Sequence, residues 1–269
     1  MKYYLYNPLA NNGIRVKIEG VKLINATKID YPKFFGKLKE EDEVVLVGGD
    51  GTISYFINHV DLSKLKNNIY IYGVGTGNDF LRDINEEAGK EILLNPYLEN
   101  LPTVRVKGKE YKFVNNMAFG IDGFCCEEAD KIRAKKPGKK INYAAIAVKG
   151  LLYKFNPCSA IVEVDGKKYR FKNVWMAPTM KGRYYGGGMK AAPDQDRFSD
   201  RLTVVVSSCR SRIKLLRTFP AFFDGGHVKE KDIVTILTGR KIHVKFSRPC
   251  AAMFDGETVL DVTEYWAEL

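Results

Sequence analysis

Two glycine-rich loops carry the residues of this sequence that are best suited to hold phosphate groups. The first glycine loop, residues 48–52 (Gly-Gly-Asp-Gly-Thr), directly follows an apolar, β-branched run at 44–47. A loop between a buried strand and a helix suits phosphate, because backbone N–H groups converge there and the helix N-terminus adds positive potential. Asp50 would suit the loop if it shared a magnesium ion with the phosphates or helped to position a proton donor. A plain strand-to-helix turn remains the alternative.

The second glycine loop, residues 75–79 (Gly-Thr-Gly-Asn-Asp), repeats this arrangement after the strand-like run 69–74. Apolar residues recur at helical spacing over 53–60, which predicts an amphipathic helix with Thr52 as its N-cap. A shorter helix is predicted around 80–84. Two neighbouring strands would then end in glycine loops at one edge of a parallel sheet, where open α/β sheets bind ligands.

A third motif, Asp255-Gly256-Glu257, lies between strand-like segments. Taken alone it predicts a hairpin turn, as does Asp165-Gly166. The sequence has neither G-x-G-x-x-G nor G-x-x-x-x-G-K-[ST], so the dinucleotide fingerprint and the Walker A loop are both excluded.

These motifs occur in a specific order that resembles the bacterial diacylglycerol kinases and related lipid kinases. The ordered set is Asn7-Pro8, the first glycine loop, Gly75-Thr76-Gly77-Asn78-Asp79-Phe80, Gly186-Gly187-Gly188-Met189 and Asp255-Gly256-Glu257. The resemblance covers nearly the whole chain. NAD kinases share the first loop and phosphofructokinases have a variant of it, whereas the second loop is similar to the lipid-kinase version.

The resemblance implies a nucleotide domain followed by a β-rich domain, with ATP in the cleft between them and a lipid hydroxyl attacking its γ-phosphate. It also implies a nucleotide site made of Asn7, Thr27, Gly48, Gly49, Asp50, Gly51, Thr52 and Thr76, supported by Asn78 and Asp79.

The same resemblance makes Glu257 or Asp255 the general base that takes the proton of the lipid hydroxyl, with a slight preference for Glu257. Asp50 is a competing candidate, because related kinases have been assigned a base in that loop. A carboxylate in this role must reach the hydroxyl within hydrogen-bond distance, and burial would raise its pKa usefully.

Family members hold a structural magnesium ion in an acidic segment after the Gly-Gly-Gly-Met run. The corresponding stretch here, 193–202, is one residue longer than the common pattern and has Arg201 where glycine is usual. Asp200 is the best-matched ligand, and a solvated acidic loop is the alternative.

The first loop of the chain departs from the family pattern on the nucleotide side. Residues 7–13 lack the usual Ser-Gly pair, and the helix expected after them is largely missing before the strand-like run 14–18. Ser54-Tyr55 stands where the family often has Asn-Glu. These departures favour, as one alternative, a non-catalytic relative that binds lipid or nucleotide as a regulator.

The predicted fold class is an α/β nucleotide-binding domain with a parallel sheet at 1–98, which the C-terminal tail could join, and a β-rich, sandwich-like lipid-substrate domain at 99–269. Strands of the second domain are predicted at 160–164, 168–171, 202–206, 233–237, 241–246 and 252–254, and helices at 142–153 and 213–223.

The net charge of the chain limits the classes of partner that it is expected to bind. The 269 residues carry a formal net charge of +11, which suits an anionic partner: nucleotide phosphate, an acidic membrane surface or nucleic acid. No nucleic-acid fold pattern accompanies the charge. A basic run precedes the apolar helix at 142–153, as a solvated loop or as an attraction for anionic headgroups; it consists of Lys131, Arg133, Lys135, Lys136, Lys139 and Lys140.

No apolar stretch reaches the ~20 residues that cross a bilayer, and the first residues lack a signal-peptide pattern. We therefore expect a cytoplasmic protein that visits the inner membrane surface, and a homodimer is compatible with the sequence. The predicted function is ATP- and Mg²⁺-dependent phosphorylation of a lipid hydroxyl, with diacylglycerol giving phosphatidic acid in phospholipid biosynthesis. Alternative acceptors are a sphingoid base, phosphatidylglycerol, undecaprenol or NAD.

Overall fold

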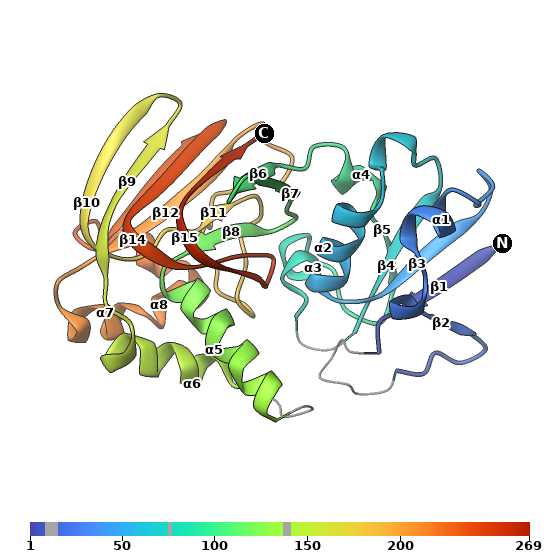
Figure 1. Cartoon of the computed structure of the whole chain (residues 1–269), viewed down its shortest axis with the longest axis horizontal. Helices are drawn as coiled ribbons and strands as arrows, with labels where there is room; N and C mark the ends of the chain where they lie inside the picture. Colours follow the sequence, from blue (N-terminus) through green and yellow to red (C-terminus); the bar gives the residue numbers. More distant parts are fainter. Residues whose placement is uncertain (9–15, 75–76, 137–140) are drawn as a thin grey trace. The chain divides into compact units, whose positions relative to one another are not determined.

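The computed structural model describes residues 1–8, 16–74, 77–136 and 141–269. The chain divides into two compact units, Met1–Leu101 and Pro102–Leu269 (Figure 1). The prediction of an α/β unit with a parallel sheet, followed by a β-rich unit, is confirmed. Within the described ranges, no helix is both long enough and apolar enough to span a bilayer.

The first unit is built on a sheet with the strand order β2-β1-β3-β4-β5, in which β1 to β4 are parallel and β5 is antiparallel to β4. The strands are β1 (Lys2–Tyr6), β2 (Leu23–Asn25), β3 (Glu43–Gly48), β4 (Asn68–Gly73) and β5 (Glu91–Leu93). The helices are α1 (Tyr31–Phe35), α2 (Asp50–His59), α3 (Asp79–Asp83) and α4 (Asn95–Leu98), with 3-10 turns η2 (Ala26–Lys28) and η3 (Leu62–Lys64). Residues 44–47 of β3 are fully buried, as a central parallel strand should be.

Helix α2 follows β3 and packs its apolar side against the sheet. Ile53, Phe56 and Ile57 are buried, and the ring of Phe56 lies 5.3 Å from that of Phe35 in α1. The predicted cap was wrong: α2 begins one turn earlier, with Gly49 at the N-cap position and Thr52 inside the first turn. The helix therefore starts within the first glycine loop.

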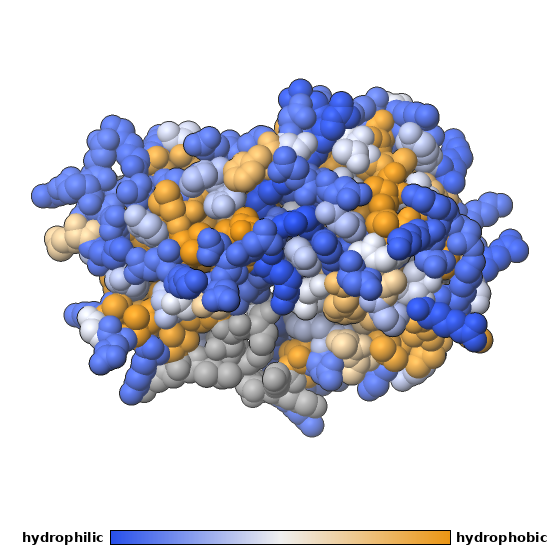
Figure 2. All heavy atoms as spheres, turned by 180° about the vertical axis from the view of Figure 1, so that it is seen from behind, coloured by the Kyte–Doolittle hydropathy of each residue, from blue (hydrophilic) through white to orange (hydrophobic). Residues whose placement is uncertain are grey.

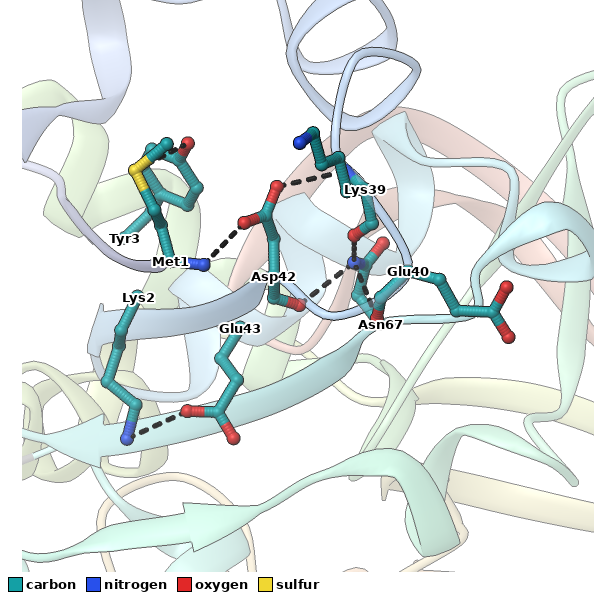
Figure 3. Close-up of polar contacts among 8 residues, drawn as sticks. All are labelled: Met1, Lys2, Tyr3, Lys39, Glu40, Asp42, Glu43 and Asn67. Carbon is teal, nitrogen blue, oxygen red and sulfur yellow. Dashed lines mark hydrogen bonds and ion pairs between the residues drawn. The ribbon is translucent and has the colours of Figure 1, made fainter.

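A polar network fastens the amino edge of this parallel sheet (Figure 3). The α-ammonium of Met1 donates to the Asp42 carboxylate at 2.5 Å, and the backbone N–H of Lys39 donates to its other oxygen at 2.9 Å. The Asn67 amide donates to the carbonyl oxygens of Lys39 (2.6 Å) and Asp42 (2.9 Å). The starts of β1, β3 and β4 are thus tied together at the edge opposite the glycine loops.

The second unit is a β-structure that closes on itself. Its order is β7-β6-β15-β14-β8-β11-β12-β10-β9, with β13 beside β12, and β14 pairs β8 with one half of its length and β9 with the other. The strands are β6 (Thr103–Val106), β7 (Lys109–Lys112), β8 (Asn116–Phe119), β9 (Cys158–Val164), β10 (Lys167–Met176), β11 (Thr179–Met180), β12 (Leu202–Ser208), β13 (Val234–Gly239), β14 (Lys241–Phe254) and β15 (Glu257–Glu268). The interior is filled with apolar side chains from these strands.

Most predicted elements of this unit are confirmed. The hairpin β9–β10 turns at Asp165-Gly166 with positive φ at both residues, as a primed turn requires. The two strands predicted at 241–246 and 252–254 form one strand, β14, whose pairing register shifts between Lys245 and Cys250. Of the strand-like run 14–18, residues 16–18 are not in a strand, and residues 9–15, on which the expected helix depends, lie outside the described ranges.

Helices cover one side of the second unit (Figure 1). They are α5 (Ile121–Lys135), α6 (Tyr143–Lys149), which continues into the π-helical turn η4 (Gly150–Lys154), α7 (Arg212–Thr218) and α8 (Ala221–Asp224), followed by the 3-10 turn η5 (Gly226–Lys229). Helix α5 was missed from the sequence, and the basic residues Lys131, Arg133 and Lys135, interpreted there as a loop, lie on it. Lys139 and Lys140 lie outside the described residues.

Candidate functional site

The carboxyl edge of the parallel sheet in the first unit gathers most of the predicted nucleotide residues. Tyr6 at the end of β1 pairs in register with Asn25 of β2 and Val47 of β3, so Asn7 and the first glycine loop leave the sheet side by side. From β1 the chain passes to β2 on one side and then returns to β3 and β4 on the other, so the progression of strands changes direction between β1 and β3. Open α/β sheets bind ligands outside the strand ends at such a switch point.

Close packing explains why two positions of the first glycine loop are glycine. A Cβ on Gly48 would lie 1.9 Å from the Thr52 hydroxyl oxygen, and a Cβ on Gly49 would lie 2.2 Å from the carbonyl oxygen of Gly77. The N–H of Asp50 donates to this same Gly77 carbonyl at 2.9 Å. The two glycine loops therefore touch backbone to backbone, and side chains would force them apart.

The Asp50 carboxylate links the two loops. One of its oxygens accepts the backbone N–H of Asp79 at 2.8 Å and the other accepts that of Phe80 at 2.9 Å. These are N–H groups of the first turn of α3, which a carboxylate satisfies well. Asp50 thus joins the start of α2 to the start of α3, and this contact explains an acid inside a phosphate-type loop.

Gly51 is the residue of the first loop that faces open space. It is exposed, and a Cβ built on it would meet no atom of the described residues within 4 Å. Gly51 lies in the first turn of α2 and is therefore exposed next to the positive end of that helix, where an anion is stabilised.

The remaining predicted nucleotide residues lie around this edge with defined neighbours. The backbone N–H and the hydroxyl of Thr27 both donate to the side-chain oxygen of Asn25, at 3.0 and 2.7 Å. Asn78 occupies the N-cap position of α3, and Asp79 is buried with the Arg82 guanidinium 2.7 Å from its carboxylate. Thr76 lies outside the described residues.

In the second unit, Asp255 begins the turn between β14 and β15. Asp255 and Gly256 both have positive φ, so Asp255-Gly256-Glu257 is a hairpin turn, the alternative that the sequence itself favoured. The buried Asp255 carboxylate accepts the backbone N–H groups of Val114 (2.6 Å), Asn115 (2.8 Å) and Asn116 (3.1 Å). It therefore fixes the chain that enters β8.

Opposing effects set the acidity of Asp255. Burial raises its pKa to about 6, while the three backbone hydrogen bonds and the charge of Arg197 act in the other direction. Arg197 is itself buried, and it donates to the Val114 carbonyl and to the Asn115 side chain. Glu257, one residue beyond the turn, is exposed. Of the two side chains, that of Glu257 is exposed to solvent and that of Asp255 is buried.

A second Asp-Gly turn in the same unit resembles the one at Asp255. Asp165 also has a positive φ, precedes a glycine and accepts backbone N–H groups of a neighbouring strand, those of Arg240 (3.0 Å) and Lys241 (2.8 Å). This turn is exposed, however. The hydrogen-bonding role of Asp255 is thus a structural device that this chain uses twice, which makes Asp165 its natural control.

The segment around Asp200 does not fit the structural magnesium that the family resemblance implies. The Asp200 side chain is 63% exposed and lies 3.5 Å from the Arg240 guanidinium. Nowhere in the described residues do three or more His, Cys, Asp or Glu side chains come together as a metal site.

Side chains of the protein form hydrogen bonds with the backbone of the loop around Asp200. The ammonium of Lys181, only 3% exposed, donates to the Ser199 carbonyl at 3.1 Å. The Gln195 amide donates to the carbonyls of Asp196 (2.8 Å) and Arg201 (2.9 Å). Burial and the nearby Arg197 lower the pKa of Lys181 to about 8. Sequence reasoning missed Lys181, because nothing in its neighbourhood marks a lysine that will be buried.

A buried acid in the second unit was also missed. Asp122, in the first turn of α5, is buried and accepts the Tyr185 hydroxyl at 2.9 Å, while its other oxygen has no hydrogen-bond partner among the described residues. Burial raises its pKa to about 7. The sequence did offer a signal for a buried acid, because Asp122 is the single charged residue in the run 113–126.

Two family models match the chain in the order of its units. The diacylglycerol kinase catalytic domain matches residues 8–101, and the YegS C-terminal NAD kinase beta sandwich-like domain matches residues 115–265. The chain is 27% identical over 264 residues to a protein of Mycobacterium tuberculosis strain CDC 1551 named diacylglycerol kinase, covering 90% of this chain and 84% of that protein.

Other relatives agree. A diacylglycerol kinase of Bacillus subtilis strain 168 is 24% identical, with 82% of this chain and 72% of that protein covered. A crystal structure of a diacylglycerol kinase from Bacillus anthracis strain Sterne has a TM-score of 0.61 at 16% identity, covering 99% of this chain and 92% of the other, and supports the fold. The matches follow the order of both units, and the chain therefore belongs to the bacterial diacylglycerol kinase and related lipid kinase family.

Proposed function

We propose that this protein transfers the γ-phosphoryl group of ATP to the hydroxyl of a lipid, with diacylglycerol as the acceptor and phosphatidic acid as the product. The observation that carries the proposal is the pair of glycine loops at the switch point of the sheet, joined by the Asp50 carboxylate. The kinase names of the relatives support the reaction class.

In this proposal the first unit holds ATP. Backbone N–H groups at the start of α2, next to the exposed Gly51, would receive phosphate oxygens. Asn7, Thr27, Thr76 and Asn78 would line the same edge. Mg²⁺ bound with ATP would neutralise charge between its β- and γ-phosphates. Asp50 would keep the two loops in place, which is a positioning role rather than that of a base.

The second unit would hold the lipid, with Glu257 as general base. The Glu257 carboxylate takes the hydroxyl proton as the lipid oxygen bonds to the γ-phosphorus. The bond from that phosphorus to the β–γ bridging oxygen then breaks, and ADP leaves. Asp255 would position the turn that carries Glu257, because its own oxygens are occupied by backbone N–H groups. Catalysis would rest mainly on positioning and electrostatics.

An acceptor panel tests the function. The purified chain is incubated with radiolabelled ATP, Mg²⁺ and, in separate reactions, diacylglycerol, a sphingoid base, phosphatidylglycerol, undecaprenol or NAD. Label in phosphatidic acid is expected. Label in another lipid would keep the reaction class and replace the acceptor, label in NAD alone would refute a lipid kinase, and absence of ATP binding by calorimetry would favour a regulatory relative.

Substitutions test the base. Glu257→Gln should abolish turnover while keeping ATP affinity and thermal stability, and Glu110→Gln, at an exposed glutamate of β7, should leave all three unchanged. Asp255→Asn should lower stability as well as turnover, whereas Asp165→Asn, in the corresponding exposed turn, should leave turnover intact. Wild-type turnover in Glu257→Gln would refute Glu257 as the base.

A further inference from the structure

Two helical segments of the second unit form one continuous surface, which we call the α6–α8 face: α6 with η4, and α7 with α8. Helix α7 contacts η4. The Arg212 guanidinium joins the segments by donating to the Leu151 carbonyl at 2.9 Å and to the Asn156 side chain at 3.0 Å. It also lies over the Trp175 ring, 4.9 Å from the centroid. The face is therefore held against the core of the unit.

The α6–α8 face leaves large apolar side chains in solvent. Its inner side is already buried, through Ile146, Leu151, Leu215 and Phe222. On the outer side a surface helix of a globular protein carries polar residues. Here the exposed residues include Tyr143, Val148, Leu152, Tyr153, Ile213 and Phe223, with 65% of Ile213 and 60% of Tyr153 accessible. These six are half of the large apolar side chains exposed within the described parts of the chain.

The charge on this face is almost entirely positive. Residues 141–162 and 201–223 contain no aspartate or glutamate. The cations of the face are Lys149, Lys154, Arg210, Arg212, Lys214 and Arg217. The face itself contains one acid, Asp224 at the end of α8, whose carboxylate accepts the backbone N–H of Gly226 at 2.7 Å. The acids at its borders are paired with cations: Glu127, Glu128 and Asp130 with cations of α5, and Asp232 with Lys214.

This combination fits the surface of an anionic bilayer. Interfacial helices place apolar side chains at the boundary between headgroups and acyl chains, while lysine and arginine extend to the anionic headgroups. Nucleic acid would use the cations but leave Leu152 and Ile213 without a role. In Figure 2, hydrophobic (orange) and hydrophilic (blue) residues lie next to one another at the lower right, on the helical side of the second unit.

We propose that the α6–α8 face docks the protein on anionic membranes, with Leu152, Tyr153 and Ile213 entering the interface. Its lysines and arginines other than Arg212 and Lys214 contact the headgroups. The purpose of docking rests on the proposed lipid kinase function, since diacylglycerol resides in the bilayer. The docking itself rests on exposure and charge alone. It assigns to α6, η4 and α7 the membrane contact that the sequence suggested for the basic run before α6.

Vesicle sedimentation of the full chain tests the proposal. Wild type should sediment with vesicles of phosphatidylcholine and phosphatidylglycerol, but not with phosphatidylcholine alone. The double variant Leu152→Ser/Ile213→Ser should bind about tenfold more weakly. Lys149→Gln and Lys154→Gln should each weaken binding about fivefold. Leu260→Ser and Lys167→Gln, exposed residues on strands of the same unit, should bind as wild type does.

Equal binding of wild type and the double variant would overturn the proposal, as would wild type that ignores anionic vesicles. Light scattering that shows a wild-type dimer, a monomeric double variant and no vesicle binding would assign the face to a protein interface instead. Activity separates the two proposals: the double variant should phosphorylate diacylglycerol in detergent micelles at the wild-type rate and lose rate on vesicles. Vesicle binding without activity on any lipid would refute the kinase function and leave the docking intact.

Discussion

Replacing Asp50 by asparagine separates a link between two loops from a group that takes part in the chemistry. The carboxylate accepts two backbone N–H groups, at 2.8 and 2.9 Å, from residues 29 and 30 positions further along the chain. Asparagine keeps one acceptor oxygen and turns an amide NH₂ toward the other N–H. One charge-assisted hydrogen bond, worth ~1.5–3 kcal/mol, is then lost, and a backbone donor is left without a partner.

The negative charge at the start of α3 is lost as well, which adds ~0.3–1 kcal/mol. We therefore expect Asp50→Asn to lower the free energy of unfolding of the first unit by roughly 2–4 kcal/mol. With a urea dependence of ~2 kcal/mol/M, the midpoint should fall by about 1–2 M. ATP affinity should fall with it, because the loops that would hold phosphate are joined by fewer hydrogen bonds.

Both tryptophans, Trp175 and Trp266, belong to the second unit, so their fluorescence does not report this change. The assay is urea unfolding followed by circular dichroism, with hydrogen exchange at the amides of Asp79 and Phe80, whose protection should decrease. Asp30→Asn is the matched control, since Asp30 caps α1 through one N–H and asparagine caps equally well. An Asp50→Asn protein with wild-type stability and ATP affinity but no turnover would refute this reasoning and make Asp50 a chemical group.

Further outcomes follow from the packing and from the buried charges. Gly49→Ala should lower both stability and ATP affinity, because its Cβ would lie 2.2 Å from the Gly77 carbonyl oxygen. Gly51→Ala should keep stability and weaken only ATP binding. Urea unfolding and calorimetry compare the two variants. Since burial raises the pKa of Asp122 to about 7, the folded chain holds this proton more tightly than the unfolded chain. The free energy of unfolding should therefore fall by roughly 4 kcal/mol as pH rises from about 4 to about 7. Asp122→Asn should flatten this pH dependence, as measured by urea unfolding. The unfolding temperature should be the same in EDTA and in Mg²⁺, because Lys181 and Gln195 serve the loop near Asp200; a rise with Mg²⁺ alone would make Asp200 a metal ligand after all.

Helix α5 shows why part of the second unit escaped prediction. Its segment contains Gly123, a poor helix former, and a mixture of charges that weakens the apolar period. The glycine is required by tertiary packing, because a Cβ there would lie 1.9 Å from the carbonyl oxygen of Ala251 in β14. Gly123 thus lowers the helix propensity of its segment, but its lack of a side chain allows α5 to approach β14.

The sequence by itself determined the features whose signals are local. The buried run at 44–47, the helical period after it and the Asp-Gly turns predicted the parallel sheet, α2 and the hairpins, and hence the edge at which the glycine loops lie. These signals suffice because strand and helix periods and turn geometry depend on neighbours within a few residues.

Only the tertiary structure decided what the acidic and basic residues of the motifs contact. Asp255 accepts N–H groups from residues 139 to 141 positions away, and Lys181 lies against a loop 18 residues further on. A buried charge must find partners among the backbone groups that the fold brings to it, and residue type and spacing do not specify those groups. The sequence therefore located the candidate phosphate loops, whereas only the fold showed that the Asp50 and Asp255 carboxylates accept backbone N–H groups and that Glu257 is exposed.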